Sequence, residues 1–94
     1  MRTLAVGDQI YNHGDMANPS HFGNVIAIKE NARLGNQYEI RPDDYYEGRT
    51  QYTITAADVS PEYKGTGLTR IVLKSAYTAW RQNQINQIIQ LGRL

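Results

Sequence analysis

Gln37-Tyr38-Glu39-Ile40-Arg41 and Gln51-Tyr52-Thr53-Ile54-Thr55 are two runs in which apolar and polar side chains alternate strictly. Alternation with a period of two is typical of a β-strand with one buried face, so each run is predicted to be a strand. The side chains at positions 38, 40, 52 and 54 are expected to face the interior. Pro42 follows the first run and is expected to end that strand, because proline cannot donate a ladder hydrogen bond.

Three further apolar runs precede these strands, at residues 4–6, 9–11 and 22–28, and turn-forming residues separate all five runs. The β-branched residues of 22–28 favour a strand, and Gly23 allows the backbone to bend sharply or to approach a neighbour closely. Short strands bounded by turn signals indicate a barrel or sandwich. We therefore predict a small β-barrel over residues 4–60, closed by a short helical turn at residues 55–59 that Pro61 stops.

The last third of the chain is expected to be an appendage to the barrel. Residues 61–74 are predicted to be a Gly- and Pro-containing linker with a short strand, although residues 68–73 could also begin a helix. From Ser75, a possible N-cap, the apolar spacing becomes helical, and Tyr77, Trp80 and Ile88 fall on one stripe. An amphipathic helix is predicted over residues 75–91, with Gly92 as its stop. This helix must cover its stripe with the barrel or with a partner.

Length and composition set the class of the protein. A chain of 94 residues is predicted to be a single domain, residues 1–94, that is mainly β with one C-terminal helix. It contains no cysteine, which excludes a disulfide framework and a thiolate zinc site and favours a reducing compartment. The N-terminal apolar run is too short for a signal peptide and no run reaches membrane-spanning length, so we expect a cytoplasmic protein with no membrane contact.

The net charge of +1 conceals an asymmetry along the chain. Residues 1–62 carry all nine acidic residues and five basic ones, a balance of 5 − 9 = −4. Residues 63–94 carry five basic residues and no acidic one, a balance of +5. A basic segment of this kind suits a nucleic-acid backbone, an acidic protein or the acidic barrel of the same chain, and composition leaves these alternatives open.

The pattern of the first sixty residues resembles a known fold family. Gly7-Asp8 entering a strand, the spacing Phe22-Gly23-x-Val25-x-x-Ile28 and the two alternating strands resemble SH3-like barrels of the KOW and Tudor type. The resemblance covers about residues 4–60 and implies a fold more than a function. SH3-like barrels commonly bind ligands through aromatic side chains beside their loops. In this chain, the resemblance implies three candidate partner-binding tyrosines: Tyr11, Tyr45 and Tyr46.

No sequence motif indicates catalysis. His13, Asp15 and His21 share one loop, but a loop supplies little rigid support and no fourth metal ligand is apparent. The serines stand in no recognisable nucleophile context. We therefore predict a non-enzymatic protein without a cofactor or a bound metal.

Two functional hypotheses remain. The first, which we favour, is a small accessory protein that binds another protein or associates with itself, for example as a homodimer. Its contacts would come from Trp80, Ile88 and the exposed tyrosines. The second is a nucleic-acid-binding accessory protein whose basic side chains meet phosphates: Lys64, Arg70, Lys74 and Arg81. Under this second hypothesis, the amide-rich face of the helix would be available to hydrogen-bond with base edges. A compact chain of this type would also suit an accessory protein of a mobile genetic element.

Overall fold

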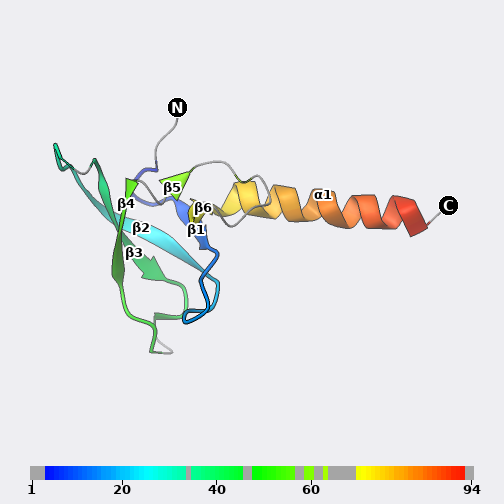
Figure 1. The fold of residues 1–94 in the computed structure, drawn as a ribbon, viewed down its shortest axis with the longest axis horizontal. Helices are drawn as coiled ribbons and strands as arrows, with labels where there is room; N and C mark the ends of the chain where they lie inside the picture. The colour runs from blue at the N-terminus through cyan, green and yellow to red at the C-terminus, as the bar shows by residue number, and fades with distance from the viewer. Residues whose placement is uncertain are drawn as a thin grey trace.

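A computed structural model describes residues 4–33, 35–45, 48–56, 59–60, 63 and 70–92 of the chain. In these ranges the chain forms six strands followed by one helix (Figure 1). The strands are β1 (Gln9–Asn12), β2 (His21–Lys29), β3 (Gln37–Pro42), β4 (Tyr52–Thr55), β5 (Val59–Ser60) and β6 (Ile71–Leu73), and the helix is α1 (Lys74–Gly92). The predicted fold class, mainly β with a C-terminal helix, is confirmed.

The six strands form one sheet in the order β4-β3-β2-β1-β6-β5, and the sheet curls into a nearly closed barrel (Figure 1). Neighbouring strands are antiparallel, except that β5 and β6 run parallel. This arrangement is compatible with an SH3-like barrel. Strand β6 pairs with β1, which confirms a strand at residues 71–73 and places the start of the helix beside the first strand. Residues 68 and 69 lie outside the described ranges.

The alternating strands bury the side chains that their pattern predicted. Tyr38, Ile40 and Ile54 are buried, and the ring of Tyr52 packs against them. Pro42 is the last residue of β3, as expected. The core cluster consists of Leu4, Ile10, Val25, Tyr38, Ile40, Ile54, Ile71 and Leu73.

The longest strand, β2, bends where the sequence allows it. Its pairing with β3 shifts register between Val25 and Ala27, which leaves Ile26 as the extra residue of a β-bulge. A Cβ atom on Gly23 would lie 2.9 Å from the carbonyl oxygen of Arg41, so only glycine allows this close approach of β2 and β3.

Three local predictions need correction. Residues 4–6 do not form a strand; the chain turns at Gly7, whose φ of 93° and hydrogen bond to the Val25 carbonyl (2.8 Å) direct Leu4 into the core instead. The predicted helical turn at residues 55–59 is shorter than expected: Ala56 is in a 3₁₀ turn, but Thr55 still belongs to β4 and Val59 to β5, and residues 57 and 58 lie outside the described ranges. The helix begins at Lys74, directly after β6, so Ser75 is inside it and is not its N-cap.

Candidate functional site

A polar pocket of about 300 Å³ opens between the loop that follows β1 and the beginning of β4. Its walls come from the end of β1, the loop 13–20, the start of β2, the residues around β4, and Arg70 just before β6. Its lining residues are Asn12, Gly14, Asp15, Asn18, His21, Arg49, Thr50, Tyr52, Thr53, Ile54 and Arg70.

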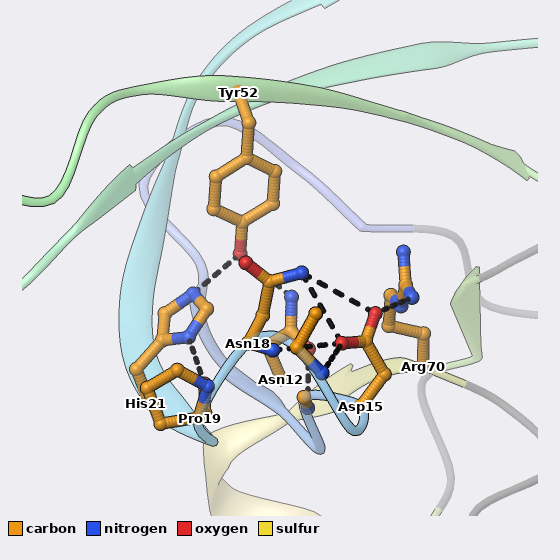
Figure 2. A network of polar contacts seen from close by, with 9 residues as sticks. Asn12, Asp15, Asn18, Pro19, His21, Tyr52 and Arg70 are labelled. Carbon is orange, nitrogen blue, oxygen red and sulfur yellow. Dashed lines mark hydrogen bonds and ion pairs between the residues drawn. The ribbon is translucent and has the colours of Figure 1, made fainter.

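A chain of hydrogen bonds crosses one wall of the pocket (Figure 2). Asn12, which is 5% exposed, donates from Nδ2 to the Tyr52 hydroxyl at 3.0 Å, and this hydroxyl lies 2.8 Å from His21 Nε2. His21 Nδ1 lies 3.2 Å from the Pro19 carbonyl oxygen. Because a carbonyl can only accept, Nδ1 carries the proton in the neutral imidazole, and Nε2 accepts the Tyr52 proton. Burial raises the pKa of Tyr52, which keeps its hydroxyl protonated and able to donate.

The charged groups of the pocket are paired within the chain. Asp15 accepts the backbone N–H groups of Ala17 and Asn18 at 2.8 Å and pairs with Arg70 at 2.6 Å. These backbone hydrogen bonds, with a smaller effect of Arg70, hold the pKa of Asp15 below its usual range. Arg49 meets Asp44 at 2.8 Å and lowers the pKa of that carboxyl by hydrogen bonding. With both guanidinium groups next to a carboxylate, the pocket offers mainly hydroxyl, amide and imidazole groups for hydrogen bonding.

A second constellation joins the barrel to the helix. It is a cluster of aromatic rings from β1, the residue that follows it, β2, position 63 and the first two turns of α1, called here the aromatic cluster: Tyr11, His13, Phe22, Tyr63, Tyr77 and Trp80. Tyr11 and Tyr77 stack with centroids 3.8 Å apart, and Tyr63 meets Trp80 edge-on at 4.9 Å. Burial raises the pKa of Tyr11 and of Tyr63, so these two hydroxyl groups stay protonated.

His13 is the polar member of the aromatic cluster. Its ring packs against Tyr11 at 5.1 Å and against Tyr63 at 4.9 Å between centroids. Among the described residues, its Nε2 atom is buried without a hydrogen-bond partner. Burial lowers the pKa of His13, because a charged imidazolium would be poorly solvated there.

Beyond Trp80, the helix leaves the barrel. Every residue from Arg81 to Gly92 is exposed, and Figure 1 shows this half of α1 extending away from the strands. We call residues 81–92 the free half of α1. Four large apolar side chains on it are 41% to 69% exposed: Ile85, Ile88, Ile89 and Leu91.

These exposed side chains continue the stripe that anchors the helix. On a helix, residues three and four apart share a face, so Ile85, Ile88 and Ile89 are neighbours and Leu91 lies one turn beyond Ile88. Ile88 and Leu91 also continue the line of Tyr77 and Trp80. The barrel therefore covers only the first two turns of α1, and beyond them Gln84 interrupts the apolar line between Trp80 and Ile88.

The candidate partner-binding residues fall in different places. Tyr11 and Trp80 are half-buried in the aromatic cluster, where they contact their own chain, whereas Ile88 is open on the free half. Tyr45 is exposed, with the Arg41 guanidinium 4.6 Å from its ring centroid. Tyr46 lies outside the described residues.

The candidate nucleic-acid-binding cations are also dispersed. Arg70 pairs with Asp15 at the pocket, and Lys74 Nζ lies 4.7 Å from the centroid of the Phe22 ring. These two cations lie on different faces of β1, because adjacent residues of a strand point to opposite faces. Lys74 is on the face of Tyr11, which packs against Phe22, and Arg70 is on the face of Asn12, which lines the pocket. Arg81 lies at the start of the free half, and Lys64 is outside the described residues.

Sequence reasoning overlooked the pocket and the connection between Asn12, His21 and Tyr52. One signal was available: Ile10 is inward, so the alternation of β1 also directs Asn12 inward, and a buried amide requires a partner. The partner, Tyr52, is 40 residues away, and only the folded sheet brings the two together.

Comparisons with known proteins give no relative: no family model, no curated protein and no solved structure matches this chain. In the part of the chain that the structure describes, α1 is not apolar enough to cross a membrane.

Proposed function

We propose that this chain is a non-enzymatic protein-interaction module of the cytoplasm, in which an SH3-like barrel holds out a helix that docks on another protein chain. The observation that carries the proposal is the free half of α1, where Ile85, Ile88, Ile89 and Leu91 are exposed on neighbouring positions. An exposed apolar stripe flanked by polar residues is typical of a helix that lies in a partner's groove or against a partner helix.

The anchoring of the helix supports this role. A free peptide of about 12 residues is barely helical in water, because nucleating a helix is unfavourable. Here the aromatic cluster fixes the first turns of α1, from which the free half can propagate. Pre-organising the helix in this way reduces the entropy lost when a partner binds.

The exposed apolar side chains of the free half supply part of the free energy that a specific complex requires. Complete burial of an Ile or Leu side chain contributes about 1.5–3 kcal/mol, so covering the exposed parts of four such side chains contributes several kcal/mol. A micromolar complex requires about 8 kcal/mol in total, after the entropy lost on association. Binding through the stripe alone is therefore expected to be weaker than micromolar, and a tighter complex requires further contacts beside the stripe.

In-cell photo-crosslinking tests the proposal. A photo-reactive benzoylphenylalanine replaces Ile88 in one variant and Asn83, on the amide-rich face, in a matched variant. The reagent is large and apolar, so it preserves the character of position 88. We expect protein adducts from position 88 and few or none from position 83. Absence of any protein adduct at position 88 would contradict the proposal.

Nucleic-acid binding is the alternative, favoured by the basic balance of residues 63–94. It is less well supported, because Arg70 and Lys74 already contact Asp15 and Phe22 within the chain and lie on different sides of β1. Its signature is a gel-shift of mixed-sequence DNA or RNA that disappears at high salt and weakens when Arg81 is replaced by Gln.

A further inference from the structure

We infer that the free half of α1 packs antiparallel against the same segment of a second copy of this chain. This inference rests on the proposed function, since it names the partner that covers the same apolar stripe. It goes beyond that function in specifying a homodimer, an orientation and a register.

The charge of the free half favours a second copy over a charged partner. Residues 81–92 contain one charged side chain, Arg81, and no acidic residue. An acidic protein or a nucleic acid would therefore find one cation to pair with along three turns of helix. A second copy presents the same nearly uncharged surface, so Ile and Leu side chains can meet without burying unpaired charges.

The residues beside the stripe are also suited to self-pairing. The opposite face of the free half carries five amide side chains: Gln82, Asn83, Asn86, Gln87 and Gln90. An amide both donates and accepts hydrogen bonds, so the amides at the rim of the stripe can pair with amides of the second copy across a two-fold axis. Gln82 already donates to Asn86 at 3.1 Å along the helix.

The bulk of the two barrels favours the antiparallel orientation. In a parallel pair in register, both barrels lie at the same end of the paired helices. In an antiparallel pair centred on the free half, they lie at opposite ends. The register that places Ile85 opposite Ile88 of the second copy also places Arg81 opposite Gly92, where no side chain obstructs the guanidinium group. The negative end of a helix dipole lies at its C-terminus, which favours a cation there.

The shape of the molecule permits this pairing. Twelve residues of helix are about 18 Å long, and Figure 1 shows that the strands lie at the opposite end of α1 from Gly92. In an antiparallel pair the two barrels therefore lie at opposite ends of the paired helices and do not collide.

The size of the contact predicts how strong the dimer is. Three turns of one helix against three turns of another bury less surface than a standard stable interface. We therefore expect an equilibrium between monomer and dimer, with dissociation at protein concentrations of roughly 1–100 µM. Because the contact is apolar, high salt should leave the dimer intact or strengthen it.

Sedimentation equilibrium of the purified full chain tests the dimer over that concentration range. The Ile88→Gln variant is expected to shift the dissociation constant upward by roughly tenfold or more, because each dimer loses two apolar side chains. Asn83→Gln is the matched control: both variants place Gln on the helix, and Gln has a helix propensity at least as good as Ile or Asn. The control is expected to dimerise like the unmodified chain.

The outcomes separate this inference from the proposed function. A chain that stays monomeric throughout the range, while position 88 crosslinks to a different protein in cells, would overturn the homodimer and leave the interaction module standing. A dimer that Ile88→Gln leaves unchanged would show that another surface associates, and would overturn the inference. A chain without a dimer and without any adduct would remove both proposals.

Cysteine crosslinking tests the orientation, since the chain has no cysteine of its own. Ile85→Cys and Ile88→Cys chains are oxidised separately and as a mixture. The antiparallel register brings position 85 near position 88 of the other copy, so the mixture should form disulfide-linked dimers several-fold faster than either chain alone, given the distance limit of a disulfide. Faster self-linking of both Ile85→Cys alone and Ile88→Cys alone would indicate a parallel pair and overturn the orientation, and faster self-linking of only one of them would overturn the register.

Discussion

The rings of Tyr11 and Tyr77 lie stacked, with centroids 3.8 Å apart and ring planes 9° from parallel. Tyr11 is in β1 and Tyr77 is in the first turn of α1, so this one pair joins the barrel to the helix. None of the described helix residues is fully buried. The helix is therefore held by contacts between partly exposed rings rather than by a buried aliphatic seam.

Replacing Tyr77 with Ala is expected to release the helix. The change removes the stacked pair and the contacts of Tyr77 with Phe22 and Tyr63, so we expect a loss of about 1–3 kcal/mol in the free energy of unfolding. Thr78→Ala, at the exposed neighbouring position, is the control and should change stability by less than about 0.5 kcal/mol. Urea unfolding measures both values. Equal stability of the two variants would show that the stack does not hold the helix.

Tyr52→Phe tests the hydrogen-bond chain of the pocket. The variant keeps the ring but leaves the buried Asn12 amide and His21 Nε2 without the hydroxyl that joins them. We expect a loss of about 1–2 kcal/mol in the free energy of unfolding, the usual effect of an unsatisfied buried polar group. Thr53→Val removes a hydroxyl from the exposed adjacent position and is expected to be nearly neutral. A neutral Tyr52→Phe would show that the hydroxyl does not stabilise the loop.

The strands were largely predictable from the sequence, and the reason is local. Alternation at Tyr38 and Ile40 decides which face is buried, and proline at position 42 ends the ladder. Residues 4–6 could not be assigned in this way. The turn at Gly7 directs Leu4 into the core. A short apolar run has the same sequence pattern whether it pairs as a strand or only packs one side chain against the core.

The exposed surface of α1 could not be located from the sequence, because its limit depends on the pairing of strands that are far apart in the chain. The apolar spacing from Tyr77 to Leu91 is helical apart from Gln84, so its period predicts the helix to within one residue at each end. The period does not reveal where the barrel stops covering the helix. That limit is set by the pairing of β6 with β1, which brings Tyr11 under Tyr77 and leaves Ile88 open.

Gly23→Ala tests the close approach of β2 and β3. The added Cβ would meet two backbone atoms, the Arg41 carbonyl oxygen at 2.9 Å and the Pro42 Cα at 3.2 Å, so the strands must move apart. We expect a loss of about 1–3 kcal/mol in the free energy of unfolding. Gly92→Ala is the control, because a Cβ at that helical position meets no atom within 4 Å. It should be neutral or slightly stabilising. A Gly23→Ala chain as stable as the control would contradict the assigned pairing.

Stability should fall as the pH is lowered below neutrality, because of His13. Burial lowers the pKa of this imidazole below its ordinary value of 6.5, so the unfolded chain binds the proton first. The contribution of the neutral His13 side chain to the free energy of unfolding is therefore complete above pH 6.5. It is lost as the pH falls from 6.5 through the lower pKa that His13 has in the folded state. The rings facing His13, Tyr11 and Tyr63, titrate far above this window. The test is urea unfolding of the His13→Phe variant, which keeps an aromatic ring, at a series of pH values. Its free energy of unfolding should change less with pH in this window than that of the unmodified chain, and an unchanged pH dependence would assign the effect to another group.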